Sequence, residues 1–375
     1  MAFTGPSEQP LFSGWLARQV ARPAFQDWAS RMPVLNRLAR RDGAEIFQLV
    51  QGFVQSQVLY ALVKLNLPRR LMDGPLLPEA LALSDGFDTR RMALLLQAGA
   101  GIGLLKRHRD GRFGLTRKGA ALCGVPGLEQ MILHHDVLYR DMADPVALLR
   151  GKTETELADF WPYVFGANGA VDAGVTETYS DLMANSQALV ARDTLRTVSL
   201  DGVRRLVDVG GGSGAFLIEV AKAYPALELE LFDLPAVMSS ARERVSRAGL
   251  SDRIELIGGS FKEDALPEEA DAISLIRVLY DHDESAIRNL IAKVFAALPP
   301  SGRLIISEPM SGGARPDPIT DVYFAFYTLA MRTGQARSAD AIAKVCADAG
   351  FVDIQTPKPF RSYVTSVVVA RKPGG

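Results

Sequence analysis

Cysteine and histidine are scarce in this chain of 375 residues, which has two cysteines and four histidines. Cys123 and Cys346 lie far apart and form no C-x-x-C pair, so we expect no cysteine-based zinc site and a reducing, cytoplasmic setting. The adjacent His134 and His135 would point about 100° apart on a helix, so they are poor joint metal ligands. We therefore expect no metal site.

The chain also lacks an excess of one charge and a long apolar run. Its 42 Lys and Arg residues nearly match its 43 Asp and Glu residues, so no global charge attracts nucleic acid. The longest apolar run, Met92 to Leu105, contains Gln97 and three glycines and is too short to span a bilayer. The N-terminus lacks the basic start and apolar core of a signal peptide. These features predict a soluble protein.

The length predicts two domains, which we place at residues 1–195 and 196–375. Within the first, residues 11–41 combine tryptophan with many arginines and a single acid, Asp27. One interpretation is a helical arm that packs on a partner subunit, with its arginines in solvent. The other is peripheral contact with an anionic membrane, because tryptophan and basic residues suit that interface. Helical surfaces with mixed faces are common, which favours the first interpretation.

Residues 44–124 have the outline of a winged helix. Apolar residues recur at helical spacing over 44–70, and helices are expected near 78–83 and from Asp88 to about Leu96, with Asp88 as a cap. Residues 104–115 predict a hairpin. The expected reading helix offers only Arg90 and Arg91 toward DNA, so the pattern favours a dimerisation scaffold over DNA binding.

Short apolar runs alternate with helical patterns from Leu206 onward, which predicts an α/β fold with a doubly wound, mostly parallel sheet. The expected strands are 206–209, 229–232, 254–257, 272–276 and 304–307. Two β-branched runs, 352–354 and 364–370, predict an antiparallel hairpin at the sheet edge.

The most informative stretch runs from Leu206 to Phe216, where an apolar strand ends in Asp208 and is followed by glycines and a helix start. Gly210, Gly212 and Gly214 allow the backbone to adopt positive φ and to approach a ligand closely. Asp233 ends the next apolar run, where a carboxylate can accept hydrogen bonds from both ribose hydroxyls.

A nicotinamide dinucleotide is one alternative ligand, because Gly210, Gly212 and Ala215 also fit G-x-G-x-x-A. Against it, Asp208 stands where a dinucleotide strand is apolar, and an acid there can meet a cationic ligand. No Gly-Lys-Ser/Thr follows the glycines, so a phosphate loop is excluded. S-adenosylmethionine, an adenosine ligand without a pyrophosphate, fits best.

Several phrases in order resemble the class I S-adenosylmethionine-dependent O-methyltransferases of the plant caffeate and acetylserotonin type. They are Val207–Gly214, Phe232-Asp233-Leu234-Pro235, Gly258-Gly259-Ser260-Phe261, Arg277-Val278-Leu279 and Ser307-Glu308-Pro309. Three more, Gly52–Gln57, Phe160–Tyr163 and Arg277–His282, resemble the bacterial hydroxyneurosporene (1-hydroxycarotenoid) O-methyltransferase branch. The resemblance spans nearly the whole chain and implies a helical, dimerising first half and a Rossmann-like second half.

This resemblance implies a set of cofactor contacts. Asp233 would hold the ribose, Ser260 and Phe261 would flank the adenine, and Gln187 would lie near the sulfonium. The full expected set is Asp208, Gly210, Gly212, Gly214, Asp233, Leu234, Gly259, Ser260, Phe261, Arg277 and Gln187.

The chain departs from the family where proton transfer is expected. The family pattern is Val-Leu-His-Asp-Trp, but here Tyr280 replaces the histidine base and His282 stands at the tryptophan position. Glu308 matches the first acid that flanks the family histidine, whereas Ala336 replaces the second. The catalytic residues we expect are Tyr280, Asp281, His282 and Glu308.

The resemblance predicts a homodimeric O-methyltransferase that acts on a hydrophobic hydroxylated acceptor, with the tertiary 1-hydroxyl of an acyclic carotenoid favoured. Expected substrate contacts are His135, Met183, Tyr327 and Met331. A phenolic or polyketide acceptor is an alternative, and a non-catalytic winged-helix regulator that senses the cofactor is another.

Overall fold

The computed structural model describes residues 14–159, 187–332 and 334–374. It divides into two compact units, Met1–Leu133 and His134–Gly375, and the division falls inside helix α8 (Leu128–Asp141). The functional boundary that we place after residue 195 stays a prediction.

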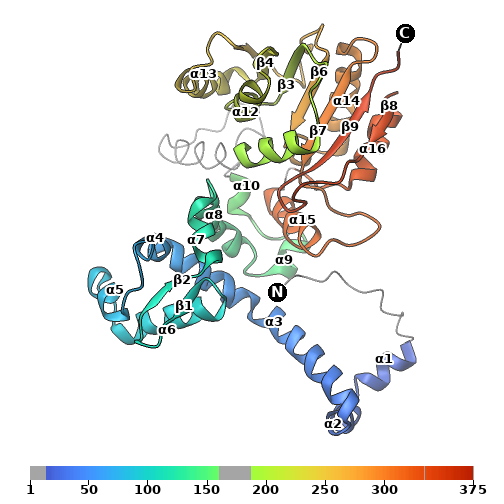
Figure 1. The fold of residues 1–375 in the computed structure, drawn as a ribbon. Helices are drawn as coiled ribbons and strands as arrows, with labels where there is room; N and C mark the ends of the chain where they lie inside the picture. Colours follow the sequence, from blue (N-terminus) through green and yellow to red (C-terminus); the bar gives the residue numbers. More distant parts are fainter. Residues whose placement is uncertain (1–13, 160–186, 333, 375) are drawn as a thin grey trace. The chain divides into compact units, whose positions relative to one another are not determined.

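The first unit is helical with one small hairpin (Figure 1). Proline begins three of its helices, where the missing N–H costs nothing. Asp88 caps α6 as predicted, because its carboxylate accepts from the Arg91 N–H at 3.1 Å. The elements are α1 (Gly14–Val20), α2 (Pro23–Arg31), α3 (Pro33–Lys64), α4 (Leu67–Arg70), α5 (Pro78–Asp85), α6 (Thr89–Gly101), β1 (Leu105–Arg107), β2 (Phe113–Leu115) and α7 (Arg117–Gly124).

The hairpin is confirmed, since β1 and β2 pair antiparallel with Leu105 opposite Leu115. A core under it includes Leu62, Leu67, Leu81 and Leu96, all fully buried. Helix, helix and hairpin together give the expected winged-helix outline.

Helix α3 starts earlier than predicted and, by length and composition alone, could cross a membrane. Our expectation of no spanning segment rested on Met92 to Leu105 and overlooked α3. Its apolar residues are interrupted by uncharged glutamines (Gln48, Gln51, Gln55 and Gln57), so no continuous run marks it.

The second unit is built on a seven-stranded sheet of order β5-β4-β3-β6-β7-β9-β8. The first five of these strands are parallel, while β9 pairs antiparallel with both β7 and β8. The strands are β3 (Arg205–Val209), β4 (Glu228–Asp233), β5 (Ile254–Gly258), β6 (Ala272–Ile276), β7 (Arg303–Glu308), β8 (Val352–Gln355) and β9 (Ser366–Arg371). The predicted fold class is confirmed.

Helices cover both faces of this sheet, as Figure 1 shows for α12 and α13 on one side and α14 and α16 on the other. Each face has its own apolar core, so the strands are buried on both sides. The helices and turns are α9 (Pro145–Leu149), α10 (Glu156–Asp159), 187–197, α12 (Ala215–Ala223), η2 (Pro235–Val237), α13 (Met238–Arg247), η3 (Leu279–Asp281), α14 (Glu284–Ala297), α15 (Thr320–Met331) and α16 (Ala339–Asp348).

The strand order reverses beside β3, with β4 on one side and β6 on the other. Ligands of open α/β sheets bind at the carboxyl ends of the strands at such a switch point. The glycine turn after β3 and the turn η3 after β6 both lie there, which defines the candidate site.

Candidate active site

The glycine turn adopts backbone conformations that favour glycine. Gly210, Gly212 and Gly214 have φ values of 71°, 57° and 79°. A Cβ on Gly210 would also lie 2.8 Å from Cγ2 of Val278, which follows the neighbouring strand β6 and directly precedes η3. The turn therefore presents backbone close to the space where a ligand would approach.

Asp208 lies beneath this turn and is fully buried. Its Oδ1 accepts from the Ser274 hydroxyl at 2.6 Å, and a Cβ on Gly211 would lie 2.6 Å from its Oδ2. Burial raises the pKa of Asp208 to about 7. Asp208 thus lies directly against the turn at Gly211.

Asp233 contacts the turn from the next strand. Its Oδ2 accepts from the Gly212 N–H at 2.7 Å, and its Oδ1 accepts from the Leu234 N–H at 2.7 Å. Burial raises the pKa of Asp233, and these two N–H donors oppose the rise. The carboxylate is therefore held in a fixed orientation at the carboxyl end of β4.

The segment after β5 lies beside Asp233, since the Gly259 N–H donates to the Asp233 carbonyl at 2.9 Å. A Cβ on Gly259 would lie 2.6 Å from the Phe232 ring, so only glycine fits. The Ser260 N–H donates to Asp264 at 2.8 Å, and the Phe261 ring packs edge-on against His282 at 5.2 Å between centroids.

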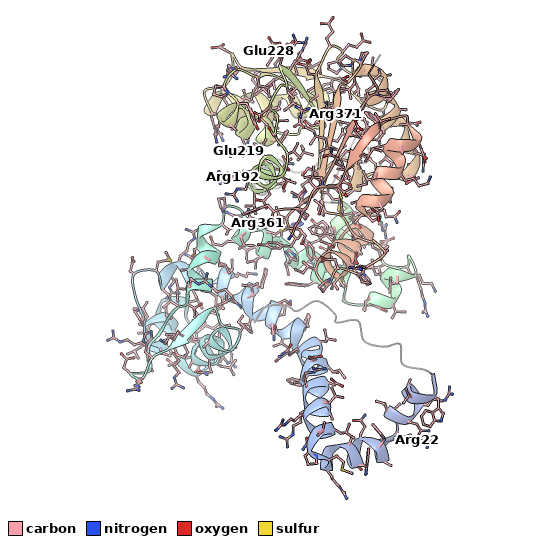
Figure 2. All side chains as sticks on the ribbon, turned by 45° about the vertical axis from the view of Figure 1, so that its right-hand side comes forward. Arg22, Arg192, Glu219, Glu228, Arg361 and Arg371 are labelled. Atoms are coloured by element: carbon pink, nitrogen blue, oxygen red, sulfur yellow. The ribbon has the colours of Figure 1, made fainter. Side chains whose placement is uncertain are left out.

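The helix at 187–197 brings Gln187 to the glycine turn, where its Nε2 lies 4.0 Å from the Cβ position of Gly212. Two ion pairs hold this helix in place: Arg192 with Glu219 on α12 at 2.9 Å, and Arg361 with the buried Asp193 at 2.7 Å for both nitrogens (Figure 2). Met183, a predicted substrate contact, lies outside the described residues.

The turn after β6 begins with strained backbone at Arg277, whose φ is 59°. Its guanidinium lies 5.5 Å from the centroid of the Tyr280 ring. Tyr280 is only 1% exposed, and burial raises the pKa of its hydroxyl while Arg277 opposes that rise. The predicted Arg277 and Tyr280 are therefore neighbours.

Glu308 lies at the end of β7 and supports η3. Its Oε2 accepts from the Leu279 N–H at 3.0 Å and from the Tyr280 N–H at 3.2 Å. Burial raises the pKa of Glu308 to about 7, and these donors and Arg337 oppose the rise. Burial also raises the pKa of Asp281 well above its usual value. Two carboxyl groups and one guanidinium thus surround Tyr280 in a buried setting.

His282 follows this turn and is half-buried. Burial, with Lys262 as a second cause, lowers the pKa of His282 to about 4. The cap of α14 is Asp283, whose Oδ1 accepts from the Ala286 N–H at 2.9 Å, so Asp281 does not cap this helix.

An aromatic cluster lies between α8 and α15. His135 stacks on Tyr323 with 5.4 Å between centroids, and His134 Nε2 lies 3.1 Å from the Tyr327 hydroxyl. Tyr327 packs in an apolar cluster with Val137, Leu138, Leu157, Tyr280, Ala330 and Met331. Sequence reasoning missed the His134–Tyr327 pair, because only tertiary structure joins two helices so far apart in the chain.

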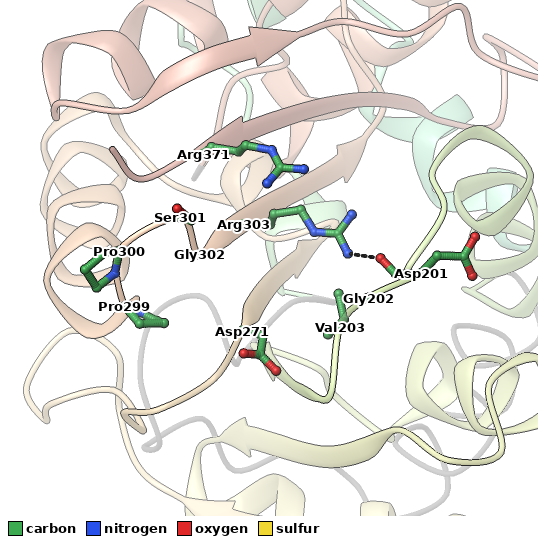
Figure 3. A pocket seen from close by; sticks show the side chains of 10 residues that line it. All are labelled: Asp201, Gly202, Val203, Asp271, Pro299, Pro300, Ser301, Gly302, Arg303 and Arg371. Carbon is green, nitrogen blue, oxygen red and sulfur yellow. Dashed lines mark hydrogen bonds between the residues drawn. The ribbon is translucent and has the colours of Figure 1, made fainter. Parts of the chain in front are cut away.

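A shallow pocket of about 340 Å³ lies elsewhere, at the amino ends of β3, β6 and β7 (Figure 3). Arg303 crosses it and donates to the Asp201 carbonyl at 3.1 Å. Because this is the opposite end of the sheet from the glycine turn, we do not assign the active site to it. Among the described residues, no three His, Cys, Asp or Glu side chains are grouped to hold a metal ion.

Comparisons with known proteins agree with this geometry. A family model for an O-methyltransferase domain matches residues 139–352, and one for an O-methyltransferase dimerisation domain matches residues 47–123. Demethylspheroidene O-methyltransferase of Cereibacter sphaeroides is 56% identical, over 93% of this chain and 92% of that protein. The protein of the same name from Rhodobacter capsulatus is 47% identical, over 98% and 95%.

Solved structures share the fold. Human N-acetylserotonin methyltransferase in complex with S-adenosylmethionine superposes with a TM-score of 0.74 at 23% identity, over 88% of this chain and 98% of that one. The predictions of an enzyme, of methyl transfer to oxygen and of S-adenosylmethionine as cofactor are confirmed. The chain belongs to the O-methyltransferase family.

Proposed function

We propose that this enzyme transfers the methyl group of S-adenosylmethionine to the tertiary 1-hydroxyl of an acyclic carotenoid. The two demethylspheroidene O-methyltransferases, similar over more than nine-tenths of this chain, support this acceptor. The observation that carries it is Tyr280, a buried tyrosine within an apolar cluster where the family has a histidine. A tertiary alcohol is much less acidic than a phenol, so it would not be deprotonated before attack, and a weaker base than histidine could accept its proton as the C–O bond forms.

In the reaction, a C–O bond forms as the C–S bond breaks, and the sulfur keeps the electron pair. Alignment of the acceptor oxygen behind the methyl carbon supplies much of the rate. The hydroxyl proton leaves late, and Tyr280 with Asp281, His282 or Glu308 would receive or relay it.

The cofactor would lie on the glycine turn. Asp233 would accept from the ribose hydroxyls, and Ser260 and Phe261 would flank the adenine. Gly210, Gly212 and Gly214 would bring backbone to the ligand, with Asp208 directly against the turn at Gly211. The remaining proposed cofactor contacts are Leu234, Gly259, Arg277 and Gln187.

The acceptor would lie along the apolar and aromatic side chains between α8 and α15. His135, Tyr327 and Met331 are the described residues we assign to this wall. Tyr327 and Met331 are buried beside Tyr280, so the acceptor hydroxyl would meet the tyrosine at the end of an apolar path.

Two partners belong to this proposal. The dimerisation-domain match supports a homodimer, in which a second copy would cover the exposed apolar residues of α3, namely Ile46, Phe47, Leu49, Val50, Phe53 and Val54. Phe53→Asp should yield monomers by light scattering, whereas Leu149→Asp, at another exposed apolar position, should stay dimeric. A dimeric Phe53→Asp variant would count against this face.

The second partner is the surface of an anionic membrane, where a cytoplasmic enzyme would meet a carotenoid. Residues 14–41 would make this contact on the second interpretation of that arm, in which Trp15 and Trp28, exposed among arginines such as Arg22 (Figure 2), meet lipid instead of a partner subunit. Sedimentation with vesicles of anionic lipid, but not of neutral lipid, would support the contact. Failure to bind vesicles of either kind would refute it.

A turnover assay with a 1-hydroxycarotenoid and a phenol tests the acceptor. Methylation of the carotenoid alone is expected. Methylation of the phenol alone would favour a phenolic or polyketide pathway, and salt-sensitive DNA binding without turnover would favour a regulator.

A further inference from the structure

The turn η3, which carries Tyr280, is held from the side of α16 as well as by Glu308. Arg337, just before α16, is 6% exposed. Its Nη1 donates to the Leu279 carbonyl at 3.3 Å and to the Gln335 carbonyl at 2.9 Å, and its Nη2 donates to the His282 carbonyl at 3.0 Å. One guanidinium therefore spans the turn from its first residue to the residue after its last.

Gly334 makes the second contact from the same segment. A Cβ on Gly334 would collide with the Tyr280 carbonyl oxygen and would lie 2.7 Å from the Cα of Asp281. The backbone at Gly334 thus lies directly against the turn, and only glycine permits this approach.

The hydrogen bonds from Arg337 complement those to Glu308, because they use the carbonyl groups of the turn instead of its N–H groups. The carboxylate of Glu308 accepts from the two N–H groups at the start of η3. The guanidinium of Arg337 donates to one carbonyl at the start of η3 and to another just after its end. The turn that carries Tyr280 is therefore hydrogen-bonded by Glu308 on one side and by Arg337 on the other. This holds even though Ala336, in the same segment as Arg337, stands where the family has an acidic residue.

We propose that Arg337 and Gly334 are positioning residues that hold the Tyr280 turn in its reactive geometry. This inference rests on the proposed function, in which Tyr280 handles the acceptor proton. Reaction rates fall steeply when a reacting group is displaced by about 1 Å, so loosening the turn should lower kcat more than binding.

Arg337→Met tests the proposal, with Arg288→Met as the matched control. Both arginines pair with Glu284, Arg337 at 3.3 Å and Arg288 at 2.8 Å, but Arg288 is exposed and donates to no carbonyl of the turn among the described residues. We expect Arg337→Met to lower kcat about 100-fold, with S-adenosylhomocysteine affinity and acceptor KM within about threefold of wild type. Arg288→Met should keep kcat within about twofold.

Two further variants keep the test decisive if Arg337→Met folds poorly. Arg337→Lys keeps the charge but cannot span both carbonyls, so we expect about a 10-fold loss of kcat. Gly334→Ala should also lower kcat, whereas Gly313→Ala should not, because the Cβ position there has no neighbour closer than 3.9 Å. Full activity of Arg337→Lys, or of Gly334→Ala, would overturn the role given to that residue.

Hydrogen exchange provides a readout that needs no acceptor. The amides of Leu279 and Tyr280 should exchange faster in Arg337→Met than in Arg288→Met. Equal exchange in both variants would overturn the proposal. A wild type that fails to methylate carotenoids would refute the proposed acceptor alone, because the exchange result does not depend on it.

Discussion

Two turns meet at the carboxyl ends of the adjacent strands β3 and β6, and they differ in what shapes them. The turn after β3 is shaped by glycines with positive φ, and its Gly212 N–H donates to the Asp233 carboxylate at the end of the neighbouring strand β4. The turn after β6 is shaped by buried side chains, with Arg277, Tyr280, Asp281 and Glu308 close together.

This difference explains where the chain follows its family and where it departs. A cofactor held by backbone geometry requires glycine at particular positions, so the first turn keeps the family pattern. A proton handled by side chains can be received by different groups, and the second turn has tyrosine in place of histidine. Substitutions in the turn after β6 can therefore alter which acceptor the enzyme uses, while the glycine turn after β3 continues to bind the same cofactor.

The largest effect is expected at the first turn, from Asp233→Ala. Loss of the carboxylate removes the hydrogen bond to Gly212 and would remove the proposed ribose contacts, so S-adenosylhomocysteine affinity should fall about 100-fold or more. Calorimetry measures this, and the exposed Asp252→Ala in the same unit serves as the control. Unchanged affinity in Asp233→Ala would show that Asp233 does not bind the ribose.

Gly210→Ala tests whether the first turn depends on the close approach of Gly210 to Val278. Gly249→Ala is the matched control, since Gly249 also has positive φ, 69°, but its Cβ position has no neighbour within 4 Å. Both variants should lose stability, and Gly210→Ala should lose about 2 kcal/mol more because its Cβ meets Val278. Equal losses in denaturant unfolding would show that the contact with Val278 costs nothing.

Tyr280→Phe tests the second turn. In the proposed function this hydroxyl would interact with a developing charge, so its removal should lower kcat about 10-fold. Cofactor affinity should not change, because the ring and its packing remain. Tyr224→Phe is the control: its hydroxyl accepts from the Leu200 N–H at the far end of α12, so it should weaken folding slightly and leave kcat intact. Full activity of Tyr280→Phe would show that the hydroxyl is idle.

The two turns also differ in how far sequence could predict them. The strands were predicted to within two residues, because short apolar runs bounded by polar residues mark strands buried on both faces. The glycines and Asp233 were predicted because their spacing along the chain carries the information.

The surroundings of Tyr280 could not be predicted in the same way. Gly334 and Arg337 reach η3 from the segment before α16, and His134 reaches Tyr327 from α8. These contacts join segments far apart in sequence, and no local spacing encodes them. Met183 lies outside the described residues, so its assignment as a substrate contact stays a prediction.

The smallest expected effect concerns Asp208, which lies under the first turn but resembles the buried acids of the second. Its pKa is raised to about 7 in the folded protein, above the ordinary value of 3.8. A folded pKa above the unfolded one means that the protonated form favours folding, so its contribution is complete below about pH 4 and is lost as pH rises through about 7. Between about pH 6 and about pH 8, the wild type should therefore lose about 1 kcal/mol of unfolding free energy relative to Asp208→Asn. Denaturant unfolding of both proteins across this range measures the difference, and the other titrating groups cancel because they are common to both. Parallel curves would mean that Asp208 stays ionised under the glycine turn, as a carboxylate serving a cationic ligand would, and the contrast between the two turns would then lie in their backbones alone.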